Sequence, residues 1–271
     1  MNLHYSMLKK NIIQAAKILF EHKLNKTGLK KLDSKIEPTN IEDAYRIQDE
    51  LKILYLTLQN NETLGKKIGV TNKEAAAQVG INEPFYGNLY TRFSAINITK
   101  LYSKNFNKPY IEPEIGFRIK EDINISLAPF NKNDIENLID GVLCSIEIVD
   151  FRFDKPINKI GAYNLIATNG ASDYWIRAES IYPLNSINLD NHEVKILINS
   201  KIKEIGNTNN VLNNPINAAL WLINTLALKG EPMLKGQFIS TGSCTKAIML
   251  NNNCKIKADF GSLGSIEIDY I

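Results

Sequence analysis

Two glutamates on one expected strand are the first residues whose type and spacing could carry chemistry. Glu112 and Glu114 flank Pro113 at the start of a stretch that alternates in polarity as far as Lys120. Side chains two apart on a strand face the same side, so the two carboxylates project together. They repel one another unless a positive charge lies between them, and a hard divalent cation such as Mg²⁺ or Mn²⁺ prefers such oxygen ligands. For this pair alone, a solvated edge strand is the alternative, because exposed acidic residues need no partner.

A third glutamate, Glu147, lies in the middle of an apolar stretch that is typical of a second strand, from Cys144 to Phe151. An acidic side chain inside a buried strand is destabilising unless it is paired, hydrogen-bonded or bound to a metal. The residues alone leave two interpretations open. Glu147 forms an ion pair, for example with Arg152, or it is a metal ligand.

Lys67 is the expected cationic residue of the site. It lies between Gly65 and Gly69, and glycines on each side let a substrate or a backbone segment approach closely. A lysine there can bind a carboxylate substrate, or act as an acid or base if its pKa is lowered. An ordinary surface lysine is the alternative. Further along, residues 241–243 (Thr-Gly-Ser) offer hydroxyl groups and a flexible backbone that suit an anionic ligand.

The elements that must position these residues follow from the spacing of apolar side chains. Apolar residues at helical spacing from Leu8 to Leu19 predict an amphipathic helix. Asn40 is a suitable N-cap for a second helix, whose apolar stripe runs from Ala44 to Leu58. The first part of the chain is therefore expected to be helical.

The remainder is expected to be rich in strands, with two further helices. Residues 71–74 have the spacing of a capping box, with Thr71 as the cap, and open an Ala-rich helix that ends at Gly80. Asn214 and the proline after it start another helix, which ends near Gly230. Strands and helices do not alternate regularly, which excludes a doubly wound sheet. The sequence predicts an α+β fold, with an N-terminal helical portion at residues 1–62 and a metal-binding, β-rich catalytic domain at residues 63–271.

The composition excludes several classes of protein. Of the 271 residues, 44% are hydrophobic, which is enough for a core and argues against disorder. The formal net charge is only +3, which argues against a nucleic-acid binder. Cys144, Cys244 and Cys254 form no CxxC pair, so free thiols in a reducing compartment are expected. No apolar run approaches the roughly 20 residues of a membrane span. We therefore expect a cytoplasmic protein without nucleic-acid or membrane partners.

Short motifs spread along the chain carry a family resemblance. They are residues 43–48 (DAYRIQ), 67–71 (KIGVT), 83–89 (EPFYGNL), 112–115 (EPEI), 147–152 (EIVDFR), 219–222 (ALWL) with 230–232 (GEP), 241–243 (TGS) and 260–265 (FGSLGS). Each motif is short, but their order and spacing together are specific. The chain resembles the 2-keto-4-pentenoate hydratase and 4-oxalocrotonate decarboxylase group of the fumarylacetoacetate hydrolase superfamily. The resemblance extends from about residue 43 to the C-terminus.

The resemblance implies the fold, the cofactor and several site residues. It implies a fumarylacetoacetate-hydrolase-like α+β fold built around a mixed β-roll, and a homo-oligomer. It also implies that Glu112, Glu114 and Glu147 hold Mg²⁺ or Mn²⁺. Lys67 matches the family's active-site lysine, and Asn169 lies in a loop that the family has near the substrate.

The chain departs from the family's motifs at Lys66, at Phe85 and in the substrate loop, where the small residues of 167–173 are also rearranged. Lys66 stands where relatives have a tryptophan, and Thr168 stands where the substrate loop of relatives has an aspartate. Phe85 replaces an aspartate that is common in hydratases, whereas decarboxylase-like members more often have an apolar residue there. These departures bear on the reaction and the substrate, and they leave the expected metal ligands intact.

The expected function is that of a divalent-metal-dependent lyase acting on a small 2-oxo acid. The leading hypothesis is hydration of a 2-hydroxydienoate in the meta-cleavage catabolism of aromatic compounds. Lys67 would transfer a proton or hold the substrate carboxylate. Arg152, Asn169 and Ser243 are expected to contact the substrate.

Two alternatives accompany that hypothesis. The first is decarboxylation of a 2-oxo-3-enedioate such as 4-oxalocrotonate, which Phe85 favours. The second is a non-catalytic partner subunit of the same fold, favoured by the departures at Phe85 and Thr168, because a fold does not by itself guarantee an activity.

Overall fold

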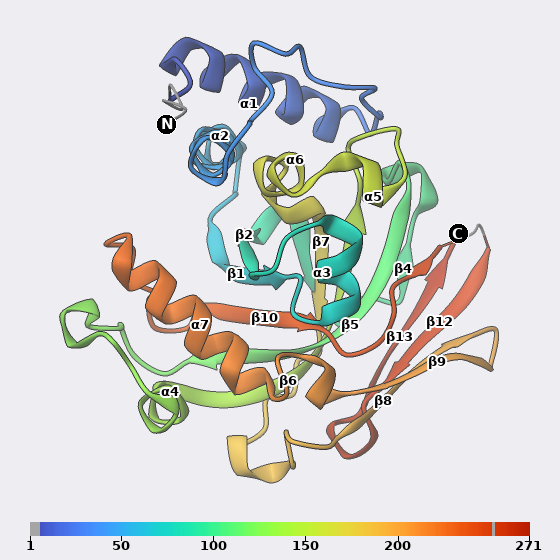
Figure 1. Ribbon diagram of the computed structural model, residues 1–271. Coiled ribbons are helices and arrows are strands. Elements are labelled where there is room, and N and C mark those ends of the chain that lie inside the picture. Colours follow the sequence, from blue (N-terminus) through green and yellow to red (C-terminus); the bar gives the residue numbers. More distant parts are fainter. Residues whose placement is uncertain (1–5, 251–252) are drawn as a thin grey trace.

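Two long helices form the N-terminal part of the computed structural model, which describes residues 6–250 and 253–271 (Figure 1). The helices α1 (Lys9–Leu24) and α2 (Ile41–Leu56) pack against each other. The apolar stripe of α1 is buried, as at Ile12. Asn40 caps α2, because its side-chain oxygen accepts a 2.8 Å hydrogen bond from the backbone N–H of Asp43. Both predicted helices are confirmed.

One curled sheet carries the middle of the chain and places the glutamates. Within the described residues its strand order is β2-β1-β10-β5-β6-β7-β3, and the short β11 also pairs with β5. The antiparallel pair β5–β6 lies at its centre, and β1 runs parallel to β10 and antiparallel to β2. The bounds are β1 (Thr63–Gly69), β2 (Phe85–Tyr90), β3 (Ser94–Ile96), β5 (Pro109–Ile119), β6 (Ile139–Asp150), β7 (Ser172–Arg177), β10 (Phe238–Ser243) and β11 (Ile248–Met249).

A second, smaller sheet lies beside the first, and Figure 1 shows its strands β8, β9, β12 and β13 in orange and red at the right. Its order in the described part of the chain is β4-β13-β12-β8-β9. All its pairs are antiparallel except β4–β13. The bounds are β4 (Lys100–Leu101), β8 (Glu193–Ile198), β9 (Lys201–Asn207), β12 (Cys254–Asp259) and β13 (Ser265–Tyr270).

The described part of the chain has five shorter α-helices between its strands. They are α3 (Lys73–Val79), α4 (Lys132–Leu138), α5 (Ile157–Ile160), α6 (Ala162–Ala167) and α7 (Pro215–Leu228). The 3₁₀ helices are η1 (Thr91–Phe93), η2 (Ser103–Asn105), η3 (Ile125–Leu127), η4 (Asn169–Ala171), η5 (Leu184–Ser186), η6 (Thr208–Asn210) and η7 (Gly261–Leu263). The helix α6 packs on α2, and α7 packs on β10 and α4. Asn214 caps α7 as predicted, accepting a 2.7 Å hydrogen bond from the N–H of Ile216.

The start of α3 differs from the prediction. The capping residue is Asn72, whose side-chain oxygen accepts a 2.8 Å hydrogen bond from the N–H of Ala75. Thr71 does not cap the helix because it is buried and its side chain lies against the backbone of Gly242. Gly80 ends the helix with a left-handed φ of 77°, as its position predicted.

The core surrounds the central strands. Residues 141–150 of β6 are all buried, and so are most residues of β5. Helices packed on mixed sheets give the α+β class that the sequence predicted, whereas a domain boundary at residues 62 and 63 stays a prediction. No helix in the described part of the chain combines the length and apolar character needed to cross a membrane.

Candidate metal centre

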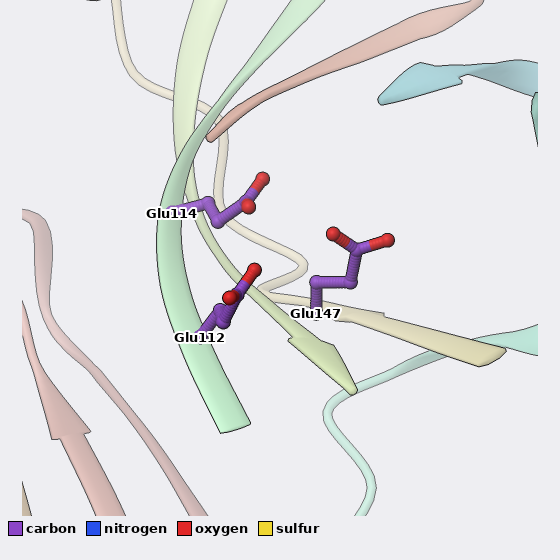
Figure 2. A group of neighbouring side chains, drawn as sticks. All are labelled: Glu112, Glu114 and Glu147. Carbon is purple, nitrogen blue, oxygen red and sulfur yellow. The ribbon is translucent and has the colours of Figure 1, made fainter. Parts of the chain in front are cut away.

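Strand register brings the three predicted glutamates together. Glu112 and Glu114 lie on β5, and Glu147 lies on β6 directly opposite Glu112. Figure 2 shows the three side chains converging on one space from these strands. Like charges that lie opposite each other across a strand pair are destabilising. The register therefore concentrates negative charge at one place, and a cation bound there would stabilise it.

The geometry of the cluster fits a metal ion. One carboxylate oxygen from each glutamate lies within 4.8 Å of the other two. Glu114 and Glu147 are fully buried and Glu112 is half-buried. Within the described structure, Oε1 of Glu114 and Oε1 of Glu147 accept no hydrogen bond, and the partner of Oε2 of Glu147 is the ammonium group of Lys67 in an ion pair. Because buried carboxylate oxygens normally have partners, these atoms fit the ligand set of a hard divalent cation.

The carboxylate of Glu114 is held by a chain of donors. Ser240 on β10 donates a 2.5 Å hydrogen bond to Oε2 of Glu114, and the N–H of Gly242 donates to the same oxygen at 3.1 Å. Trp175 on β7 in turn donates its indole N–H to Ser240 at 2.8 Å. These contacts fix the orientation of the carboxylate while its Oε1 stays unbonded.

Gly242 cannot be replaced without disturbing this support. Its φ is 106°, in the left-handed range that favours glycine, and a Cβ there would overlap the side chain of Thr71. Glycine at this position thus lets the backbone N–H reach Glu114.

Lys67 is the cation that the structure itself places against the cluster. Its Nζ lies 3.0 Å from Oε2 of Glu147 as an ion pair, and donates a 3.1 Å hydrogen bond to the carbonyl of Gly170. The side chain is buried. The ring centre of Phe85 lies 5.9 Å from the same ammonium group, so one side of the lysine faces an apolar wall.

The charges of the cluster are unbalanced without a further cation. Burial alone would lower the pKa of Lys67, but Glu147, Glu112 and Glu114 outweigh burial and raise it. Burial, followed by the charge of Glu147, raises the pKa of Glu112 to about 7 and that of Glu114 well above its usual value. Three carboxylates thus surround one ammonium, and the surplus negative charge favours either protons or a divalent ion.

The loop of Asn169 borders Lys67, and its own side chain is already engaged. The N–H of Asn88 donates to Oδ1 of Asn169 at 2.7 Å, and Nδ2 of Asn169 donates to the carbonyl of Asn88 at 2.9 Å. Gly87 permits this approach, because a Cβ there would press against the backbone of Asn169. Asn169 therefore clamps its loop to β2, and its contact with a substrate stays a prediction.

Ser243 lies next to the cluster. It is the Cα partner of Glu114 across β10 and β5, and it is buried. Its hydroxyl donates a 2.9 Å hydrogen bond to the carbonyl of Thr245. The predicted substrate contact of Ser243 is compatible with this position and stays a prediction.

Arg152 belongs to a different buried cluster. Its guanidinium forms ion pairs with Asp150 and Asp173, and Asp173 also pairs with Lys23 of α1. All four side chains are buried. The open alternative of an ion pair between Glu147 and Arg152 is wrong, because the partner of Glu147 is Lys67. A substrate contact of Arg152 stays a prediction that this placement does not support.

Sequence reasoning missed the residues that orient the cluster. Ser240, Trp175 and Asn88 have no distinguishing local pattern, because their roles depend on which strands are neighbours. One signal was available for Ser240. It directly precedes the Thr-Gly-Ser run, so that run marked the right strand.

Replacing Ser240 by Ala should weaken metal binding. The variant loses the hydrogen bond to Glu114, and the affinity for Mn²⁺ should fall by about 10–100-fold, as is usual when a group that orients a ligand is removed. Titration followed by electron paramagnetic resonance measures this. Thr241→Val is a matched control, because it removes a hydrogen bond to the carbonyl of Ile115 on the same strand pair and leaves Glu114 untouched. Equal affinities in Ser240→Ala and the wild type would contradict the assigned role.

Comparisons with known proteins identify relatives of the chain. No family model matches the chain. It is 30% identical over 241 residues to the 2-oxo-hept-4-ene-1,7-dioate hydratase of Escherichia coli, covering 85% of this chain and 87% of that enzyme. Its structure is similar to that of 4-oxalocrotonate decarboxylase from Pseudomonas putida G7, solved with magnesium and adipate, with a TM-score of 0.92, 25% identity and coverage of 99% and 100%.

A more distant likeness concerns the fold alone. Fumarylpyruvate hydrolase from Pseudomonas aeruginosa, solved with Mn²⁺ and pyruvate, is 8% identical with a TM-score of 0.60, covering 76% of this chain and 88% of that one. The predicted fumarylacetoacetate-hydrolase-like fold is thus confirmed. The chain belongs to the family of the 2-keto-4-pentenoate hydratases and 4-oxalocrotonate decarboxylases.

Proposed function

We propose that the chain is a divalent-metal-dependent lyase that hydrates a 2-hydroxydienoate in the meta-cleavage catabolism of aromatic compounds. One observation carries the proposal. Three converging glutamates, with buried oxygens that accept no hydrogen bond in the described structure, lie beside a buried lysine. The family, with its hydratases and decarboxylases, supports the same class of reaction.

Glu112, Glu114 and Glu147 would hold the metal ion, Mg²⁺ or Mn²⁺. Their carboxylate oxygens are the ligands that these hard cations prefer. When bound there, the ion supplies Lewis acidity and draws electron density out of a 2-oxo carboxylate ligand. Ser240 and Gly242 keep Glu114 in the orientation that leaves one of its oxygens available.

Lys67 would hold and move the proton. Hydration of a 2-hydroxydienoate moves the enol proton to carbon, which gives an unsaturated 2-oxo acid. One water then adds across the carbon–carbon double bond of that acid, a proton to one carbon and a hydroxyl to the other. The glutamates raise the pKa of Lys67 against the effect of burial, which favours the protonated form of its Nζ. That proton passes to the substrate carbon, and the proton released by the added water returns to Nζ. The carbonyl of Gly170 keeps the ammonium in place.

Decarboxylation of a 2-oxo-3-enedioate is the second candidate, and two observations favour it. The ring of Phe85 gives Lys67 an apolar neighbour, and an apolar environment favours the loss of a carboxylate as neutral CO₂. The Pseudomonas putida decarboxylase was solved with adipate, a dicarboxylate. In this reaction the C–CO₂ bond breaks, its electron pair stays on the substrate, and Lys67 supplies one proton to carbon.

The two reactions are separated by one pair of assays with the purified chain and Mg²⁺ or Mn²⁺. The proposal expects metal-dependent consumption of 2-hydroxypenta-2,4-dienoate. Release of CO₂ from 2-oxohex-3-enedioate without hydration would favour the decarboxylase instead. Bound metal without turnover of either compound would favour the non-catalytic partner subunit.

Two finer expectations accompany the proposed function. A homo-oligomer and a cytoplasmic location, both expected from the sequence, stay predictions. Light scattering of the purified chain measures the first of them.

A further inference from the structure

Lys66 lies next to Lys67 on β1, and its side chain lies on the opposite face of the strand. Only 5% of its side chain is exposed. Its Nζ donates hydrogen bonds of 2.8 Å to Oδ1 of Asn88 and to Oε1 of Glu231, and lies 5.1 Å from the ring centre of Tyr86. The proposed mechanism uses none of these groups.

Asn88 connects Lys66 to the loop that borders the metal centre. Because Lys66 holds Oδ1 of Asn88, the amide nitrogen of Asn88 faces Asn169 and lies 3.4 Å from its Oδ1. The backbone of Asn88 forms the two stronger hydrogen bonds to Asn169. The carbonyl of Gly170, the next residue of that loop, accepts a hydrogen bond from Lys67. Lys67 thus holds Gly170 directly, and Lys66 is linked to Asn169 through Asn88.

The turn needs such support, because its backbone is unfavourable by itself. Asn169, Gly170 and Ala171 all have left-handed φ angles, of 61°, 64° and 58°. Glycine adopts this region freely and asparagine tolerates it, so the strain lies chiefly at Ala171, and strained residues persist only where their surroundings fix them. The contacts that fix this turn come from β2 through Asn88, and Lys66 fixes the amide of Asn88.

We infer that Lys66 is a positioning residue of the proposed reaction. Through Asn88 and Asn169, Lys66 fixes the turn at residues 169–171. The carbonyl of Gly170 in that turn then aligns Lys67 with Glu147. Lys66 touches neither the expected metal ligands nor, on this inference, the substrate. The inference rests on the proposed function for its kinetic part, whereas its structural part stands on the hydrogen bonds alone.

Lys66→Met tests the inference, with Lys52→Met as the matched control. Methionine keeps the apolar stem and removes the donors. Lys52 donates to the same oxygen of Glu231 at 2.8 Å, and the structure gives it no hydrogen bond to Asn88. We expect kcat of Lys66→Met to fall by about 10–100-fold while KM and the Mn²⁺ affinity stay within about threefold, as misplacement of an acid–base group predicts. Lys52→Met should keep the wild-type kcat.

Hydrogen exchange provides a measure that needs no substrate. Amides in residues 166–174 should exchange at least about tenfold faster in Lys66→Met, with α1 and α7 unchanged, because only the turn loses its support. A role in general stability would instead raise exchange along the whole chain. Uniformly faster exchange, unchanged exchange at 166–174, or an equal effect of Lys52→Met would overturn the inference.

If Lys66→Met does not fold, a second variant tests the contact between Asn88 and Asn169. Asn88→Asp keeps the acceptor for Lys66 and places a carboxylate oxygen against Oδ1 of Asn169, so the same local exchange is expected. A wild-type chain without turnover would remove the proposed function, and the exchange measurement would still decide the positioning role. Wild-type turnover with unchanged exchange in the variants would remove only the positioning role.

Discussion

Glu147→Gln is expected to lose metal binding and, with it, catalysis. Glutamine has nearly the same shape, but it removes one negative charge and one anionic ligand from the group of three glutamates. Residues that merely orient a ligand change metal affinity by about 10–100-fold when they are lost, so loss of a ligand should lower the Mn²⁺ affinity by at least about 100-fold. Titration calorimetry with Mn²⁺ measures the affinity, and turnover at a fixed metal concentration should fall to the background rate.

The control for that experiment is a glutamate that lies outside the cluster. Glu121 follows β5 and is exposed, so Glu121→Gln should bind Mn²⁺ as the wild type does. If Glu147→Gln keeps both the affinity and the turnover of the wild type, the three-carboxylate site is wrong. Loss of affinity in both variants would point to a general effect of charge rather than to a site.

Lys67→Met is expected to have the opposite effect on the metal and an equally severe effect on turnover. General acid–base groups contribute about 10²–10⁴-fold, so kcat should fall by that factor. The affinity for Mn²⁺ should stay or rise, because the variant removes a positive charge that lies 3.0 Å from Glu147 and competes for the same carboxylates. Initial rates and metal titration on the same preparation measure both quantities.

The exposed Lys73 on α3 provides the matched control for this lysine. Lys73→Met should leave both kcat and metal affinity unchanged. A Lys67→Met enzyme that turns over at the wild-type rate would show that another group moves the proton. A Lys67→Met protein that no longer binds Mn²⁺ would contradict the competition between lysine and metal.

The local elements of this fold were predictable because short-range rules govern them. Alternation along β5 predicted that Glu112 and Glu114 share a face, and Asn40 and Asn214 identified two helix starts. The start of α3 was misplaced by one residue, because both Thr71 and Asn72 are good caps. The contact of Thr71 with Gly242, about 170 residues further along the chain, decided which of them caps the helix.

The candidate site was only partly predictable, because its pairings depend on register and on strand neighbours. An acidic residue in an apolar stretch indicated that Glu147 needs a partner, but sequence alone could not place it opposite Glu112. Arg152 was a reasonable partner by proximity along the chain. Lys23 and Asp173, distant in sequence, complete the cluster that holds Arg152 instead.

The residues that support the site without belonging to the glutamate cluster could not be predicted from the sequence, for the same reason. Lys66 was identified as a departure from the family's motif, but its role depends on Asn88, which is its neighbour across the β1–β2 pair. Asn169 was expected at the substrate because the family resemblance implies that its loop lies there. In the structure the loop borders Lys67, and the asparagine side chain fastens the loop to β2.

The central claim is that Glu112, Glu114 and Glu147 together bind one divalent cation that also engages a 2-oxo acid. A crystal of the wild-type chain grown with Mn²⁺ and oxalate, measured for anomalous scattering, tests it most directly. The account predicts one manganese peak within about 2.5 Å of an oxygen from each of the three glutamates, with oxalate completing its ligands. An anomalous map in which the three carboxylates converge without manganese between them, or in which the ion is bound elsewhere, would contradict the claim.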